Sequence, residues 1–249
     1  MNSKELIAQR KAKKIYRDGD RCVKTFEDSF SKSDILNEAL NLARVEEAGL
    51  NVPEVLDVCT EDGKRSITYK YIEGETMDSL MKKNPEKLDE YLEKFVDIQI
   101  DVQSRKCPML SLLREKMINK IRISDLDSIQ KYDLHTRLDG MPRHTRLCHG
   151  DFNPSNVVFG SDGKVYILDW SHATQGNGSA DAARTYLLFY LEDKKEVAEK
   201  YLDLFCKKTR TPKPYVQSWI PIVAASQSVK GNKDEREFLL KWATVVDYV

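Results

Sequence analysis

The feature that most constrains this sequence is a polar loop between two short β-prone runs near its middle. The stretch 147–159, LCHGDFNPSNVVF, carries one carboxylate, Asp151, and one carboxamide, Asn156. A further apolar run leads directly into Asp169, and Ser-Asp-Gly at 161–163 predicts a tight turn before that run, because glycine tolerates the positive φ such turns demand. We therefore expect hairpin-linked strands that bring these three polar side chains to the same edge.

Oxygen-bearing side chains grouped in this way predict a magnesium site. Carboxylate and carboxamide oxygens suit a hard cation such as Mg²⁺, which takes few protein ligands and leaves its other positions to phosphate and water. The five cysteines are scattered without a Cys-x-x-Cys pair, and the four histidines form no His-x-x-x-His pair. A zinc site and a disulfide framework are therefore not expected, and buried reduced thiols are.

The N-terminal part of the chain mixes short strands with one helix. Two Asp-Gly pairs lie between β-prone runs and predict hairpins. A helix begins near Asp34, capped by Ser31 or Ser33, and ends at Gly49. The predicted strands span 14–17, 21–26, 55–58 and 66–72.

After residue 75 the apolar residues recur at helical spacing, with one β-prone block at 145–170. The predicted helices span 88–102, 112–121, 123–138, 180–191, 196–207, 215–229 and 235–246. The fold class is therefore α+β. A small β-sheet lobe with one helix, residues 1–73, precedes a larger, mainly helical lobe, residues 74–249.

Composition limits the possible partners. Forty Lys and Arg balance forty Asp and Glu, which argues against a nucleic-acid binder, because such proteins normally carry a basic excess. No apolar run approaches the roughly 20 residues of a membrane-spanning helix. The first residues, MNSKELIAQRKAKK, lack the apolar core of a signal peptide. We expect a cytoplasmic protein without a nucleic-acid or membrane partner.

The motif His149-Gly150-Asp151, then four residues, then Asn156, followed by Ile167-x-Asp169-Trp170, resembles the signature of the aminoglycoside phosphotransferase and choline kinase family. That family shares the protein-kinase-like fold, and the spacing matches the kinase catalytic loop. The resemblance implies a bilobal kinase-like molecule that uses ATP and Mg²⁺.

The resemblance also implies roles for individual residues. Asp151 orients the acceptor hydroxyl and accepts its proton, and Asn156 and Asp169 hold Mg²⁺ on the nucleotide phosphates. Lys24, in Cys-Val-Lys, resembles the lysine that reaches the phosphates, although a solvated edge-strand lysine is the alternative. Glu38 resembles its ion-pair partner, with Glu46 and Glu47 on the same helix as alternatives.

Other segments resemble the family's hinge, which binds the nucleotide, and the residues that support its catalytic loop. The stretch 69–74 resembles the hinge, where the Lys70 carbonyl and the Ile72 amide would bind adenine, and only Asp-Gly-Asp at 18–20 remains of a phosphate loop. His149 organises the catalytic loop rather than carrying protons. Asp181 caps the helix that begins near it and braces the loop, with capping alone as the alternative.

The resemblance predicts an ATP-dependent phosphotransferase that moves the γ-phosphate to a hydroxyl of a small molecule, aminoglycoside-, choline- or sugar-like. Two alternatives remain: a non-catalytic nucleotide-binding or regulatory protein on a kinase fold, and a protein Ser/Thr kinase. The missing Asp-Phe-Gly and Ala-Pro-Glu elements argue against protein phosphorylation. The presence of every expected catalytic residue argues against an inert scaffold.

Overall fold

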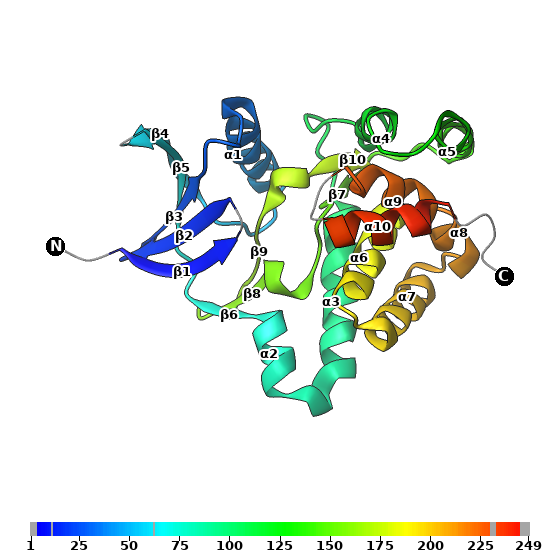
Figure 1. Ribbon diagram of the computed structural model, residues 1–249. Coiled ribbons are helices and arrows are strands. Elements are labelled where there is room, and N and C mark those ends of the chain that lie inside the picture. The colour runs from blue at the N-terminus through cyan, green and yellow to red at the C-terminus, as the bar shows by residue number, and fades with distance from the viewer. Residues whose placement is uncertain (1–3, 11, 62, 230–232, 245–249) are drawn as a thin grey trace. The chain divides into compact units, whose positions relative to one another are not determined.

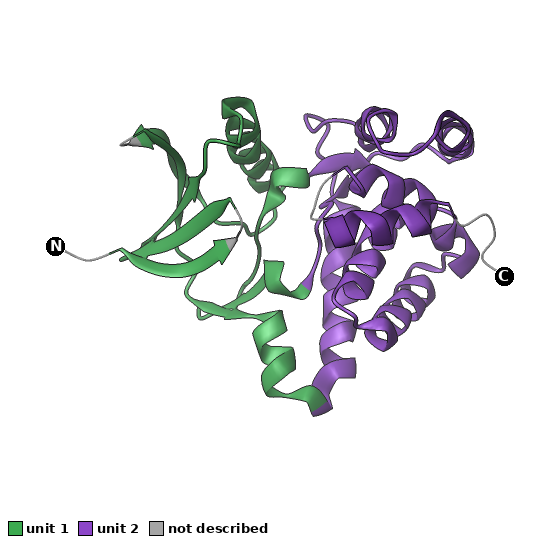
Figure 2. Cartoon of the chain, in the orientation of Figure 1, with its two compact units in different colours: residues 1–85, 154–172 green, residues 86–153, 173–249 purple. Residues whose placement is uncertain are grey.

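The computed structural model describes residues 4–10, 12–61, 63–229 and 233–244 (Figure 1). The chain forms two compact units, each built from two segments (Figure 2). The first unit comprises Met1–Pro85 and Pro154–His172, and the second comprises Glu86–Asn153 and Ala173–Val249. The division into lobes at residues 73 and 74 stays a prediction.

A five-stranded antiparallel sheet forms the main part of the first unit, in the order β1-β2-β3-β5-β4. Helix α1, Lys32–Glu47, packs on β4 and β5, and Ser31 is its N-cap. Lys24 on the central strand β3 lies opposite Ile15 and Ile67 on its two neighbours. The strands are β1 Glu5–Arg10, β2 Lys13–Asp18, β3 Arg21–Phe26, β4 Val55–Glu61 and β5 Lys64–Lys70.

A second, three-stranded sheet of the first unit contains the predicted hairpin. Strands β8, Val157–Gly160, and β9, Val165–Ile167, pair antiparallel, and β6, Gly74–Thr76, pairs with β8. Helix α2, Met77–Lys83, follows directly, capped by Thr76. The hairpin is tied to the rest of the unit where the Ile167 amide donates to the Asn51 carbonyl, 3.1 Å.

Helices make up most of the second unit. Phe95 in α3 stacks on Phe152, with ring centroids 4.5 Å apart, and both side chains are fully buried. Two short strands, β7 Arg146–Cys148 and β10 Thr174–Gly176, pair antiparallel beside them. The helices are α3 Leu88–Ser104, α4 Leu113–Arg122, α5 Ser128–Gly140, α6 Gly178–Leu191, α7 Lys195–Thr209, α8 Lys213–Gln217, α9 Ile220–Gln227 and α10 Lys233–Ala243.

Two predicted helices differ from the observed ones for local reasons. The helix expected over 215–229 is divided into α8 and α9, and Pro221 lies in the first turn of α9. Proline has no N–H to donate to the preceding turn, so it favours a new helix start. The helix expected from residue 123 begins only at Ser128, where Asp127 and Gln130 form a capping box.

Within the part of the chain that the structure describes, none of the helices combines the length and the apolar character needed to cross a membrane.

Candidate active site

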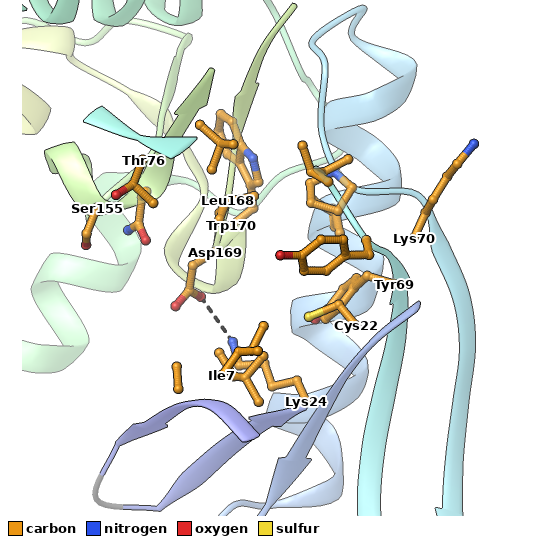
Figure 3. Close-up of a pocket in the computed structure, with 18 of the residues that line it drawn as sticks. Ile7, Cys22, Lys24, Tyr69, Lys70, Thr76, Ser155, Leu168, Asp169 and Trp170 are labelled. Carbon is orange, nitrogen blue, oxygen red and sulfur yellow. Dashed lines mark hydrogen bonds and ion pairs between the residues drawn. The ribbon is translucent and has the colours of Figure 1, made fainter. Parts of the chain in front are cut away.

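A cavity of about 400 Å³ lies within the first unit (Figure 3). Strands β1, β2 and β3, helix α1, the segment between β5 and β6, and the ends of β8 and β9 supply its walls. The predicted nucleotide and metal residues all line it: Lys24, Glu38, Lys70, Ile72, Asn156 and Asp169.

Lys24 is the centre of a buried charge cluster. Its Nζ lies 2.5 Å from Glu38 Oε1 and 3.5 Å from Asp169 Oδ1, the contact drawn in Figure 3. Lys24 is only 6% exposed and Glu38 only 4%. Burial lowers the pKa of Lys24, but Asp169 and Glu38 outweigh it and raise the pKa above its ordinary value. Lys24 is therefore a buried, charged residue of a central strand, not a solvated edge lysine.

Glu38 is held by more than its lysine partner. The Tyr69 hydroxyl donates to Glu38 Oε1 at 3.0 Å. Glu46 and Glu47, the alternatives on the same helix, are exposed and do not line the cavity. The structure therefore brings Glu38, among the three acids considered, to Lys24.

A second lysine of the cluster, Lys13, was missed by the sequence analysis. Its Nζ lies 3.4 Å from Glu38 Oε2, so one carboxylate faces two ammonium groups. Burial and the charge of Lys24 lower the pKa of Lys13. The alternation of side chains along β2 provides the signal, because Lys13 and Ile15 share the face that lines the cavity.

Asp169 follows β9 in a left-handed backbone conformation, with φ 58°. The Ser171 hydroxyl donates to Asp169 Oδ1 at 2.9 Å. Burial raises the pKa of this carboxyl, but Lys24 and Lys13 outweigh that effect and hold the pKa well below its usual range. Asp169 is therefore ionised at neutral pH.

Asn156 lies next to the chain segment that carries Asp169. It ends a short 3-10 turn, Pro154–Asn156, and is buried. Its carbonyl accepts a hydrogen bond from the Leu168 amide, 2.8 Å, which fastens the turn to the residue before Asp169. The expected proximity of Asn156 and Asp169 is thus observed.

These two residues fit a magnesium ion bound largely through phosphate and water. Among the described residues, no group of three or more His, Cys, Asp or Glu side chains could hold a metal ion. One ionised carboxylate and one carboxamide are the small, oxygen-only donor set that Mg²⁺ takes when a nucleotide supplies further oxygens.

The segment expected to bind adenine has part of its backbone already engaged. The Lys70 amide donates to the Glu54 carbonyl and the Tyr71 amide to the Asp20 carbonyl, at 2.9 and 2.8 Å. Among the described residues, no partner holds the Ile72 amide. The Lys70 side chain extends away from the other lining side chains (Figure 3), so Lys70 faces the cavity through its main chain.

The predicted remnant of a phosphate loop has a different position. Asp18, Gly19 and Asp20 form the turn between β2 and β3, with Gly19 at φ 63°, and none of them lines the cavity. The hairpin before them, β1 to β2, contributes Ile7 and Ala8 to the lining instead. Strand β1 was not expected, because its side chains from residue 5 to 9 are all exposed and show no alternation.

Asp151 lies in the second unit, in a loop held from both sides. The preceding Gly150 has φ 80°, which glycine adopts readily. The Asp151 amide donates to Nδ1 of His149 at 3.2 Å, and His149 is fully buried in a T-shaped contact with the ring of Phe152. His149 therefore accepts a hydrogen bond within the loop, and its role as an organiser of the loop stays a prediction.

Asp181 contacts this loop from helix α6. Its Oδ1 accepts a hydrogen bond from the Gly150 amide at 2.7 Å. The N-cap of α6 is Asn177, which accepts from the Ser179 amide, whereas Asp181 lies in the first turn. Asp181 thus bonds to the loop without capping the helix.

Comparison with known proteins finds relatives that agree with one another. The model of the phosphotransferase enzyme family matches residues 7–215. A thermostable mutant of aminoglycoside phosphotransferase APH(4)-Ia is similar in structure, with a TM-score of 0.72 and 15% identity over 96% of this chain and 92% of that one. Choline kinase LicA from Streptococcus pneumoniae has a TM-score of 0.66 and 17% identity over 96% and 90%. A search of curated protein sequences finds no match.

The expected family, the α+β protein-kinase-like fold and the enzyme class, a small-molecule kinase, are confirmed. The family model spans most of the sequence, from β1 through α8. The chain therefore belongs to the phosphotransferase enzyme family.

Proposed function

We propose that this protein transfers the γ-phosphate of ATP to a hydroxyl of a small molecule, with Mg²⁺ and Asp151 as the base. The observation that carries the proposal is the cavity of the first unit, where the Lys24–Glu38 pair lies beside the ionised Asp169 and Asn156. Structural relatives support the choice of nucleotide: complexes of the APH(4)-Ia mutant contain AMP-PNP or ADP, and one of LicA contains AMP.

The nucleotide would lie along the cavity of the first unit. The Lys70 carbonyl and the Ile72 amide would bind the adenine edge. At the other end, Lys24 would contact the phosphates, since an ammonium group neutralises phosphate charge. Glu38 would hold the Lys24 side chain in place, and Lys13 would add a second positive charge.

Asn156 and Asp169 would hold the magnesium ion on the phosphates. A bound Mg²⁺ neutralises negative charge that develops on the phosphoryl oxygens during transfer. Asp169 is suited to this because the two lysines keep it ionised. Its left-handed backbone costs on the order of 1 kcal/mol, and such strain is common where a functional side chain must be held at a fixed angle.

Asp151 would orient the acceptor hydroxyl and accept its proton as the oxygen attacks the γ-phosphorus. His149 and Asp181 would act as structural supports, because both bond to the backbone of the loop that carries Asp151. The acceptor class is aminoglycoside-, choline- or sugar-like. One relative forms a ternary complex with hygromycin B, and another is a choline kinase.

We also place the protein in the cytoplasm. The reaction consumes ATP, and none of the five cysteines forms a disulfide, as in a reducing compartment.

The test is ADP release with Mg²⁺ and ATP across a panel of aminoglycosides, amino alcohols, sugars and nucleosides. Asp151→Asn and Asp169→Asn are expected to abolish the signal. A thermal shift of the wild type with Mg-ATP is the companion measurement, because a bound ligand stabilises the folded state. Unchanged rates in both variants would reject the residue roles. No stabilisation at millimolar nucleotide would favour an inert scaffold, and phosphorylation of a peptide substrate alone would favour a protein kinase.

A further inference from the structure

One face of helix α6 holds the catalytic loop on both sides of Asp151. Before Asp151, the Gly150 amide donates to Asp181 Oδ1 at 2.7 Å. After it, the Thr185 hydroxyl donates to the Phe152 carbonyl at 2.9 Å. Residues 181 and 185 are one helical turn apart, so they share a face, and the residue before Thr185 lies on that face too.

Arg184 is that residue, and it faces the Asp151 carboxylate. Its Nη2 lies 3.6 Å from Asp151 Oδ1, and the two side chains are only 14% and 19% exposed. Burial lowers the pKa of Arg184, and Asp151 is the carboxylate that opposes this most strongly, ahead of Glu235 and Asp181. A guanidinium group stays protonated in proteins even when buried. α6 thus presents a fixed positive charge to Asp151.

The remaining nitrogens of Arg184 are not engaged elsewhere. Nε and Nη1 are buried and have no hydrogen-bond partner among the described residues. A buried arginine with unsatisfied N–H groups is costly to retain. Its pairing with Asp151 therefore accounts for its position.

The proposed chemistry explains why a cation is needed here. The loop from His149 to Asn156 contains no lysine or arginine. When the nucleotide and acceptor bind, an anionic phosphoryl group approaches the base and repels its carboxylate. A neighbouring cation that pairs with Asp151 opposes that repulsion and holds the carboxylate in place.

We propose that Arg184 is a positioning residue of the reaction, which holds the Asp151 carboxylate in its orientation while the phosphoryl group approaches. This inference rests on the proposed role of Asp151 as the base. Loss of the cation is expected to lower kcat at least about tenfold. KM for ATP should stay within about twofold, because Arg184 does not line the nucleotide cavity.

The experiment measures kcat and KM from ADP release with Mg-ATP for Arg184→Gln, Arg184→Lys and Thr185→Val, with melting temperatures recorded first. Arg184→Gln should show the lowered kcat, and Arg184→Lys should recover much of the wild-type kcat because it keeps the charge. Thr185→Val is the matched control: it removes a neighbouring bond to the same loop without changing charge, so its kcat should fall less than that of Arg184→Gln. Should Arg184→Gln fail to fold, Arg184→Lys is compared with Thr185→Val, and the lysine variant should keep the larger share of the wild-type kcat.

A wild-type kcat in Arg184→Gln, no recovery of kcat in Arg184→Lys, or an equal fall of kcat in Thr185→Val would overturn the inference. The proposed function fails separately, if the wild type does not turn over ATP or if Asp151→Asn is as active as the wild type. An inactive Asp151→Asn together with a fully active Arg184→Gln would therefore reject only the role of Arg184.

Discussion

The Glu38 carboxylate lies between two ammonium groups. We therefore predict that its loss lowers the free energy of unfolding more than the loss of either lysine does. In Glu38→Gln, Lys24 and Lys13 remain close together, and Asp169, at 3.5 Å from Lys24, is the carboxylate left beside them among the described residues. Removing one partner of a buried ion pair costs about 3–5 kcal/mol. In Lys24→Met, Glu38 keeps Lys13 at 3.4 Å and the Tyr69 hydroxyl at 3.0 Å. The expected loss is then about 1.5–3 kcal/mol, the value of a hydrogen bond to a charged group.

Urea denaturation of the wild type and the variants measures these differences as changes in the free energy of unfolding. The double variant Lys13→Met/Lys24→Met is the sharper part of the test. Among the described residues it leaves Glu38 buried with the Tyr69 hydroxyl as its remaining partner, so the loss of stability should exceed the sum of the two single losses. A Lys24→Met loss as large as that of Glu38→Gln, or additive losses in the double variant, would refute the idea that Lys13 compensates for Lys24.

Three further predictions concern the cavity and its walls. Gly74→Ala places a Cβ 2.3 Å from the Phe159 carbonyl oxygen, so it should destabilise the protein by about 1–3 kcal/mol and weaken ATP binding. Gly140→Ala is the control, because its Cβ would have nothing within 4 Å. In the same thermal and titration assays it should be neutral or slightly stabilising. Burial raises the pKa of Asp169, but Lys24 and Lys13 outweigh this effect and lower it. The stabilisation that the ionised carboxylate provides is therefore complete above about pH 4 and is lost as the pH falls toward the folded-state pKa. Asp169→Asn should accordingly lose less stability than the wild type on acidification, as measured by urea midpoints. Cys22 lines the cavity and burial raises its pKa, so iodoacetamide labelling at alkaline pH, followed by mass spectrometry, should slow with Mg-ATP. Cys206 on α7, whose pKa burial raises to about 11, is the control, and equal slowing at both thiols would argue against a nucleotide in this cavity.

The part of the site that the sequence predicted depends on local spacing. Asn156 and Asp169 meet because a short hairpin with Gly163 at its turn links their strands, and turn chemistry is readable from neighbouring residues. Lys24 was identified from a short motif on a β-prone run. The prediction that Asp151 joins Asn156 and Asp169 remains a prediction, since Asp151 lies in the other unit.

The features that the sequence did not reveal depend on distant partners. Strand β1 exposes its described side chains, so no alternating pattern marks it. Lys13 belongs to a basic run that is typical of a solvated surface, and although alternation places it on one face of β2 with Ile15, its partner Glu38 lies on helix α1. Arg184 lies on the helix whose Asp181 was expected to brace the loop, but no motif of the sequence marks Arg184 itself as a partner of Asp151. Which strand or loop packs against an element is set by the whole fold, not by its own residues.

The two-segment construction of the first unit has a consequence for how this protein acquires its structure during synthesis. Strand β6 emerges from the ribosome early, but the strand it pairs with, β8, follows only after α3, α4 and α5 have been made. Many multidomain chains complete their first domain before the next is translated. Here that order is impossible, because the unit that starts first needs residues through His172. A nascent chain paused near Pro85 would expose β6 without its partner strand, so that β6 could pair with another chain. Slow translation between β6 and β8 would therefore favour misfolding or aggregation most.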